Sequence, residues 1–195
     1  MKKTIIVVAA FFIMSGAKAQ SAHFGIKAGL NASSLSYEGN SDMQSKIGFN
    51  AGLLAHIHTG SEFWAFQPEV YYSAEGAKSK SNSNESTDLG YINVPVLIQY
   101  MFSNGFRLEA GPQVGFVMSG KSKLSSTTTD IKDNLKGAVF SIPLGLSYLT
   151  STGLGFDARY NFGISNISKT APSKVRSNVF QFDVFYQFSG PKVSR

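Results

Sequence analysis

Cysteine is absent from the 195-residue sequence, and charged residues make up only 15% of it, against about 25% in an ordinary soluble domain. Without cysteine the chain has no disulfides, thiolate metal ligands or cysteine nucleophiles. The formal net charge is +6. Lys2, Lys3 and Lys18 lie in a segment expected to be removed, and the remaining positive excess is too small and dispersed to indicate nucleic-acid binding. A chain of this length is expected to form one domain.

Long hydrophobic runs are missing after the first twenty residues. Those first residues follow the pattern of a secretory signal peptide, with Lys2 and Lys3 at the start, ten apolar residues over Ile5–Met14 and a small-residue end at Ala19. We expect residues 1–19 to be cleaved off. The alternative, an N-terminal membrane anchor, needs about 20 apolar residues. No later stretch approaches that length, so a membrane-spanning segment would have to be a strand.

Glycine and aromatic residues are abundant instead, with 19 Gly, 16 Phe, 8 Tyr and 1 Trp. From His23 onward, bulky apolar residues alternate with small or polar ones at a period of two, which is typical of strands with two different faces. This alternation predicts eight strands, over His23–Leu35, Lys46–Ile57, Phe63–Glu75, Gly90–Phe102, Phe106–Met118, Gly137–Leu149, Leu154–Asn166 and Asn178–Phe188.

The connections are alternately long and short. The long ones are polar (Ser36–Ser45, Gly76–Leu89, Ser119–Lys136 and Ile167–Ser177), and the short ones are turns (His58–Glu62, Ser103–Gly105 and Thr150–Gly153). Long loops at one end and tight turns at the other are the layout of an outer-membrane barrel. The sequence therefore predicts an all-β fold, an eight-stranded antiparallel up-and-down transmembrane β-barrel over residues 20–188, followed by a short C-terminal tail over residues 189–195.

Two kinds of barrel fit the alternation. A membrane barrel turns its apolar side chains to lipid, whereas a secreted soluble barrel turns them inward around an apolar ligand. Side-chain volume favours the membrane barrel, because an eight-stranded interior has little space and the polar face is rich in glycine and serine. We expect a small polar lumen and an aromatic lipid-facing exterior, with a girdle formed by Trp64, Tyr72, Tyr100, Tyr148, Tyr160 and Tyr186.

The inward-facing positions also carry charges, and buried charges must be paired or hydrated. Three cations and four anions permit a nearly neutral network that fills and rigidifies the barrel. The alternative is an ion path or a proton-sensitive gate, for which eight strands leave little open cross-section. The predicted lumen charge network consists of Lys27, Glu69, Arg107, Glu109, Asp157, Arg159 and Asp183.

Several stretches carry a family resemblance. They are Phe24–Asn31 (FGIKAGLN), Phe66–Ser73 (FQPEVYYS), Tyr91–Tyr100 (YINVPVLIQY), Leu108–Phe116 (LEAGPQVGF), Asp157–Asn161 (DARYN) with Gly163, and the last strand to Phe188. In this order they resemble the outer-membrane β-barrel family of Bacteroidetes called PorT-like. The resemblance implies a membrane barrel in a Gram-negative envelope and, by analogy with the name-giving members, a role accessory to protein secretion. It does not imply one particular activity.

Barrels of this kind often end on an aromatic residue that the assembly machinery reads. Here Ser189–Arg195 follows Phe188. We expect Phe188 to act as the assembly signal, with the tail either in the periplasm or forming a small contact with a partner.

The catalytic motifs Gly-x-Ser-x-Gly, Gly-x-x-x-x-Gly-Lys-Ser/Thr and His-Glu-x-x-His do not occur. His56 and His58 would lie on one face of a strand, but a metal site would need a third ligand. No nucleophile–base pair can be assembled from the carboxylates, since Arg107 and Arg159 make ion pairing the simpler account. We therefore expect no enzyme activity, no metal and no cofactor.

Function is accordingly expected at the long loops. Ala77–Thr87 and Ser119–Thr129 are rich in hydroxyl groups and lysine, and loops on a rigid scaffold often carry function. The expected partners are outer-membrane lipid, the barrel-assembly machinery during biogenesis, and an extracellular glycan or envelope protein. The leading hypothesis is a non-enzymatic barrel with a structural, adhesion or envelope-partner role. The alternatives are a narrow pore and the secreted soluble carrier.

Overall fold

A computed structural model of the chain describes residues 22–37, 43–79, 85–124, 127–169 and 175–188. The predicted signal peptide and C-terminal tail lie outside these residues. The described strands are β1 (Ala22–Tyr37), β2 (Met43–His58), β3 (Trp64–Ser79), β4 (Glu85–Met101), β5 (Phe106–Ala110), β6 (Gln113–Leu124), β7 (Thr127–Asp130), β8 (Ala138–Leu149), β9 (Leu154–Gly163) and β10 (Val175–Gln187), with a 3-10 helix, η2 (Lys132–Asn134). No described helix is long and apolar enough to cross a membrane.

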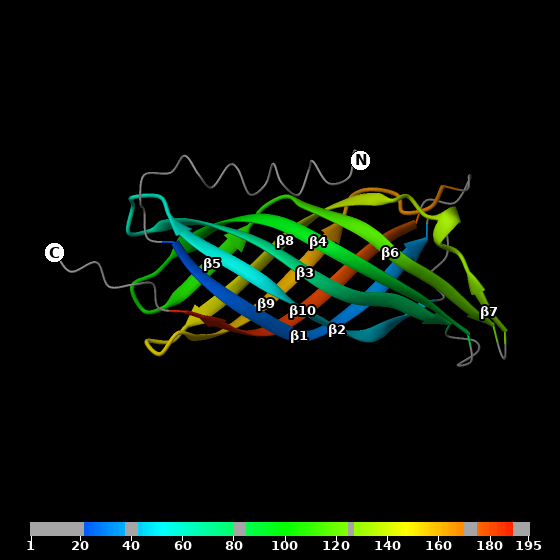
Figure 1. The fold of residues 1–195 in the computed structure, drawn as a ribbon, viewed down its shortest axis with the longest axis horizontal. Coiled ribbons are helices and arrows are strands. Elements are labelled where there is room, and N and C mark those ends of the chain that lie inside the picture. Colours follow the sequence, from blue (N-terminus) through cyan, green and yellow to red (C-terminus); the bar gives the residue numbers. More distant parts are fainter. Residues whose placement is uncertain (1–21, 38–42, 80–84, 125–126, 170–174, 189–195) are drawn as a thin grey trace.

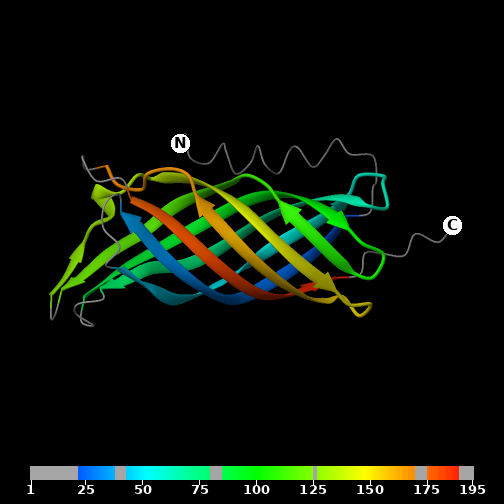
Figure 2. The same ribbon diagram turned by 180° about the vertical axis from the view of Figure 1, so that it is seen from behind.

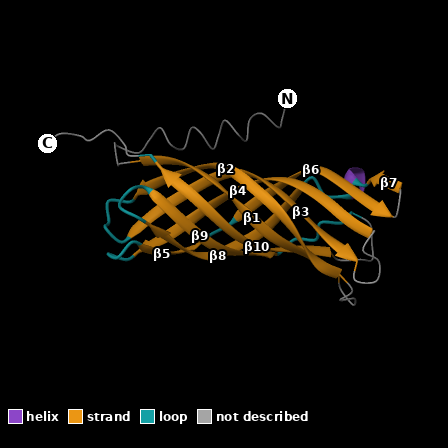
Figure 3. Ribbon diagram, turned by 90° about the horizontal axis from the view of Figure 1, so that it is seen from below, coloured by secondary structure: helices purple, strands orange, loops and turns teal. Residues whose placement is uncertain are grey.

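The strands close into an antiparallel ring of eight wall strands, which confirms the predicted barrel (Figure 1). β5 and β6 together form one wall strand, interrupted at Gly111 and Pro112. β10 lies beside β1 and closes the ring, from Gly25 opposite Gln187 to Tyr37 opposite Val175 (Figure 2). The tight turns gather at one end, here called the turn end, and β7 and η2 lie at the other, the loop end (Figure 3).

Bulky apolar side chains point outward around the barrel and form an apolar belt. On β1, Phe24 and Leu30 are 54% and 63% exposed, and Phe182 on β10 is 52% exposed. Exposed apolar area of this extent suits lipid rather than water. This arrangement is the opposite of what the soluble-carrier alternative requires.

Several strands run beyond the predicted limits at the loop end. Residues predicted as loops continue the β3–β4 pairing as far as Lys78 opposite Ser86, and the β4–β6 pairing as far as Glu85 opposite Leu124. These extensions are mostly polar, with Ala77 and Leu89 as isolated inward-facing apolar residues, so the sequence shows no sustained alternation there. The prediction of long irregular loops was therefore wrong for most of Gly76–Leu89 and for the first part of Ser119–Lys136.

The lumen contains large as well as small side chains. Tyr71 lies opposite Gly52, and Phe185 lies opposite Gly155. A Cβ atom on Gly155 would come within 2.2 Å of the Phe185 ring. Gly155 therefore makes space for the Phe185 ring, and Gly52 makes space for the Cβ and backbone of Tyr71. The expectation of a lumen lined by small residues was only partly correct.

Above the polar lumen, the loop end is filled by apolar side chains. Leu135, which follows η2, and Ile167, which follows β9, pack against inward-facing residues of the strand extensions. We call this group the apolar cap. It consists of Leu35, Ala77, Leu89, Tyr91, Val117, Leu135, Ile167 and Val175.

Candidate functional site in the lumen and at the loop end

Arg159 of β9 lies in the lumen and contacts three carboxylates. Its Nη1 and Nη2 atoms are 3.0 Å and 3.1 Å from Oε2 and Oε1 of Glu69 on β3. Its Nε and Nη2 atoms are 3.0 Å and 2.6 Å from Oε1 of Glu109 on β5. Nη2 also contacts Asp157, two residues earlier on β9. A guanidinium group suits this position because its planar set of donors serves several acceptors at once.

Lys27 of β1 extends this arrangement to β10. Its Nζ atom lies 3.0 Å from Oε2 of Glu69 and 2.7 Å from Oδ2 of Asp183. The same ammonium lies 4.9 Å from the centre of the Tyr71 ring, within range of a cation–π interaction. Glu69 is thus shared by both cations. We call the connected charged residues the lumen network: Lys27, Glu69, Glu109, Asp157, Arg159 and Asp183.

Neutral amide side chains surround the lumen network and donate to its carboxylates. Gln67 donates to Glu69 at 2.8 Å and Gln99 donates to Glu109 at 2.7 Å. Asn50 and Gln181 each donate to Asp183 at 2.7 Å. A role for these amides was not predicted, although their positions on the inward-facing side of the strands were a usable signal.

Arg107 differs from the other six predicted residues because it makes no described ion pair. It is buried on β5, and its Nη1 atom has no hydrogen-bond partner among the described residues. The structure therefore joins two cations with four carboxylates, where the sequence analysis expected three cations with four. Arg107 fails to join because it lies two residues from Glu109 toward the turn end, away from Arg159.

The lumen network ties opposite walls together. All of its side chains are buried. Other buried polar atoms, including Asn31 Oδ1 and Asn50 Oδ1, have no protein partner in the described part of the chain, and such atoms in polar interiors are sites for bound water. The arrangement is a filled, hydrogen-bonded interior.

The three histidines meet at the turn end of the lumen. The ring centres of His56 and His58 are 4.7 Å apart, and those of His23 and His58 are 5.9 Å apart. Sequence spacing brings only His56 and His58 together, because the position of His23 opposite His56 depends on the register between β1 and β2. Among the described residues, no group of three or more His, Asp or Glu side chains is arranged to hold a metal ion.

At the loop end, Asp88 lies on the extension of β4 between two lysines. It contacts Nζ of Lys46, and its Oδ2 lies 3.0 Å from Nζ of Lys123. Partial burial alone would raise the pKa of Asp88, but hydrogen bonds and charge attraction from Lys46 and Lys123 outweigh it and hold the pKa below its usual value. This cluster was not predicted from the sequence, because Asp88 and Lys123 fall in segments predicted as loops.

Phe188 directly follows β10 at the turn end. Its backbone N–H donates to the carbonyl of Phe24 at 2.8 Å, and its ring lies 5.5 Å from that of Tyr186. The side chain is half exposed on the outer surface. This position agrees with that of a terminal barrel residue, while its role as an assembly signal stays a prediction.

The closed ring, the outward apolar belt and the alternation of turns and loops define an eight-stranded transmembrane barrel of an outer membrane. The family model described as outer membrane protein beta-barrel domain matches residues 18–169, and the chain belongs to that family. A comparison of the sequence with curated proteins finds no match.

Similar folds are found among solved structures, and two of them are described here. Neisserial surface protein A (NspA) has a TM-score of 0.60 and 17% sequence identity, over 87% of this chain and 100% of that one. Ail, the attachment invasion locus protein of Yersinia pestis, was solved in complex with the heparin analogue sucrose octasulfate. It has a TM-score of 0.54 and 16% identity, over 86% of this chain and 99% of that one. The protein is located in the outer membrane. In bacterial barrels of this membrane, the short turns generally face the periplasm and the longer loops face outward.

Proposed function

We propose that the protein is a non-enzymatic surface protein that binds an anionic partner, such as an acidic glycan or a phosphate-bearing envelope component, at its loop end. The observation that carries this proposal is the charge of the strand extensions and of the segments around η2 and Ile167 at the loop end. Basic side chains there outnumber acidic ones within the described residues. The basic ones are Lys46, Lys78, Lys121, Lys123, Lys132, Lys136, Lys169 and Arg176, and the acidic ones on the outside are Glu85, Asp88, Asp130 and Asp133.

The position of these charges supports adhesion or envelope contact. Lys121 and Lys123 stand on the paired strand β6 and are exposed, so the fold holds their positions in place before a partner binds. Pre-organised positive charge attracts anionic partners and determines which partners bind. The sucrose octasulfate bound to Ail is a polyanion of the kind this surface would suit.

The filled lumen favours this function over the narrow-pore alternative. The lumen network lies across the middle of the barrel and the apolar cap fills the loop end. An accessory role in secretion, as the PorT-like resemblance implies, is one form of the envelope contact we propose. We also propose that residues 1–19 are a cleaved signal peptide and that Phe188 is the assembly signal.

Binding to immobilised heparin, with elution by salt, tests the proposed function. The variant Lys121→Gln/Lys132→Gln should elute at clearly lower salt than the wild type, because two exposed charges of the surface are lost. The matched control Ser103→Glu/Ser151→Glu lowers the net charge equally, but at the turn end. Equal weakening in both variants, or no retention of the wild type on heparin, would contradict a specific anionic site at the loop end.

A further inference from the structure

A group of lysines gathers on the wall of the barrel at the loop end, on β2, β3 and β6. Nζ of Lys123 lies 3.0 Å from Oδ2 of Asp88, and Lys46 contacts the same carboxylate. Lys46 reaches from β2 to β4 across β3, where Gly76 stands opposite Asp88 without a side chain. On β6, Lys121 stands opposite Asp88 from the other side. We call this group the lysine patch: Lys46, Lys78, Lys121 and Lys123.

The lysine patch faces outward, away from the lumen. Ala77 belongs to the apolar cap inside the barrel, and successive residues of a strand point to opposite faces, so Lys78 points outward. A Cβ atom on Gly120 would lie 2.6 Å from a side chain of the cap, so the neighbouring Lys121 points outward too. Asp88 shares this face because it stands opposite Lys121. The lysine patch therefore lies on the same surface as the apolar belt.

The apolar belt continues directly below the lysine patch on the same strands. Phe49 of β2 and Tyr72 of β3 are 56% and 37% exposed, and their ring centres lie 5.8 Å apart. Lys46 stands three residues from Phe49 toward the loop end, which is about 10 Å along a strand. A lipid whose acyl chains lie against these two rings therefore has its head group at the level of the lysine patch.

The outer surface carries this positive charge at the loop end alone. The four lysines of the patch have two carboxylates beside them, Asp88 and Asp130, of which Asp130 stands opposite Lys121 on β7. The three short turns at the turn end, all within the described residues, contain no lysine or arginine and one acidic residue, Glu62. Lysines at a membrane surface attract anionic lipid head groups. The difference between the two ends therefore matches a bilayer whose anionic head groups lie on the loop-end side.

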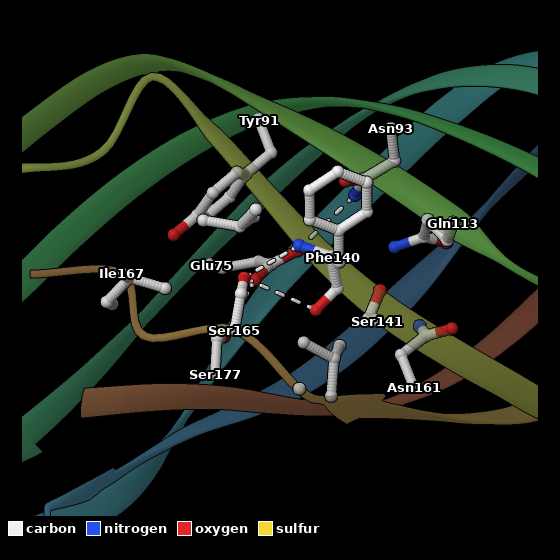
Figure 4. A pocket seen from close by; sticks show the side chains of 13 residues that line it. Glu75, Tyr91, Asn93, Gln113, Phe140, Ser141, Asn161, Ser165, Ile167 and Ser177 are labelled. Atoms are coloured by element: carbon white, nitrogen blue, oxygen red, sulfur yellow. Dashed lines mark hydrogen bonds between the residues drawn. The ribbon is translucent and has the colours of Figure 1, made fainter. Parts of the chain in front are cut away.

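The interior at the loop end is filled, which leaves the outer surface for a partner. A cavity of about 20 Å³ lies beside the apolar cap, with Glu75, Tyr91 and Asn93 among the residues that line it (Figure 4). This volume is enough for one water molecule. The Glu75 carboxylate in its wall already accepts a hydrogen bond from Ser177 at 3.0 Å.

We infer that the lysine patch binds the head-group phosphates of lipid in the leaflet at the loop end, with the acyl chains against Phe49 and Tyr72. This inference rests on the proposed function, because it assigns one side of the same positive surface to a particular partner. Asp88 holds Lys46 and Lys123 in place before lipid binds, which lowers the side-chain entropy lost on binding. Neighbouring strands are about 5 Å apart, so a head group with two phosphates contacts lysines on more than one strand.

Lipid competition measured by native mass spectrometry tests the site. The purified barrel is mixed in detergent with equal amounts of cardiolipin, which carries two phosphates, and phosphatidylcholine, which has no net charge. The wild type should retain cardiolipin preferentially. Lys78→Gln/Lys123→Gln should lower the apparent affinity for cardiolipin by about tenfold, because two exposed charges of the patch are lost. The matched control Lys132→Gln/Lys136→Gln removes two exposed lysines at η2 and just after it, and should keep the wild-type affinity.

Thermal stability in vesicles is the second measurement, and it keeps the test decisive if lipid is lost in the mass spectrometer. Cardiolipin added to phosphatidylcholine vesicles should raise the thermal midpoint of the wild type and of the control more than that of Lys78→Gln/Lys123→Gln. The midpoint is read from the heat-dependent mobility on SDS gels. Inorganic phosphate at the same phosphate concentration should not reproduce the rise, and an equal rise would overturn the assignment to lipid.

Two further results would overturn the inference. One is an equal affinity of the wild type for the two lipids, and the other is an equal loss of affinity in the patch variant and the control. If the wild type still binds heparin in either case, the proposed function stands without this inference. Failure of the wild type to bind either heparin or cardiolipin would overturn both.

Discussion

Arg159 and Glu69 join opposite walls of the barrel through two parallel contacts of 3.0 Å and 3.1 Å. They are 90 residues apart in the sequence, and β9 and β3 are separated by three wall strands in either direction around the ring. Such paired contacts between a guanidinium and a carboxylate are strong and strongly dependent on direction. This single pair therefore fixes the distance across the lumen.

Replacing Arg159 should destabilise the barrel more than any other single change in the lumen network. Arg159→Ala leaves Glu69, Glu109 and Asp157 without this cation, and breaking a buried pair costs about 3–5 kcal/mol. Urea unfolding in lipid vesicles, followed by the fluorescence of the single tryptophan, Trp64, measures the effect.

Arg107→Ala is the matched comparison, since Arg107 is a buried arginine without a described ion pair. It should cost clearly less than Arg159→Ala. Equal losses in the two variants would mean that lost packing, rather than the ion pairs, explains the effect.

Gly155→Ala should destabilise the barrel by about 1–3 kcal/mol, the usual cost of overpacking. The added Cβ would lie 2.2–2.6 Å from three atoms of the Phe185 ring. The double variant with Phe185→Leu should recover part of the loss, since the smaller side chain makes room. Gly137→Ala, where a Cβ meets nothing within 4 Å, is the control in the same unfolding assay. A double variant no more stable than Gly155→Ala alone would argue against the ring contact.

The Asp88 cluster should add stability that disappears in acid. The pKa of Asp88 is lower in the folded protein than its usual value of 3.8, so the contribution is fully present above that value and is lost as the pH falls through the folded-state pKa. The difference in thermal midpoint between the wild type and Asp88→Asn should therefore be larger at about pH 7 than at about pH 2. Because Lys46, Lys123 and Asp88 are partly exposed, the difference should also shrink in high salt. A difference independent of pH would assign the stability to another interaction.

The reconstituted wild-type barrel should give no stable stepwise ion current in planar bilayers. The lumen network and the apolar cap both block the interior, and an eight-stranded barrel is narrow. A known porin added to the same bilayer provides the positive control. Regular conductance steps from the wild type would favour the narrow-pore alternative over our proposed function.

Truncation after Phe188 should leave outer-membrane assembly intact, whereas Phe188→Ala should reduce it. The measurement is the fraction of protein in the outer membrane that shows heat-dependent mobility. Phe180→Ala, at another exposed phenylalanine of β10, is the control for a general loss of lipid contact. Equal defects at both positions would make Phe188 an ordinary lipid-facing residue.

The sequence was sufficient to predict the barrel, but not the apolar cap at its loop end or the pairing of charges within its lumen. Phe24, Leu30 and Phe182 stand at alternate positions on long strands, and this local period identifies the lipid-facing side. At the loop end, apolar side chains no longer point only outward. Leu35, Leu89 and Val117 point inward and form part of the apolar cap. That reversal follows from the packing of Leu135 and Ile167, which only the folded chain brings into contact with them.

The pairing within the lumen network also depends on the folded chain rather than on the local sequence. Alternation placed Lys27, Arg107 and Arg159 inside, yet which cation meets which carboxylate depends on the register and tilt around the whole ring. Glu75 was missed for a simpler reason. It follows Glu69, Tyr71 and Ser73 at the same period of two, but it stands at the end of the predicted strand, where its inward direction was not recognised.

The continuous β3–β4 pairing has a mechanical consequence. Its register continues without a shift from Trp64 opposite Tyr100, near the turn end, to Lys78 opposite Ser86 at the loop end. A force applied at the loop end by a bound partner acts along the strands, while the hydrogen bonds between the strands lie across that direction. The ladder is then loaded in shear, so many bonds share the load instead of opening one after another. The strand extensions at the loop end and the lipid-embedded wall would consequently move as one stiff body under tension.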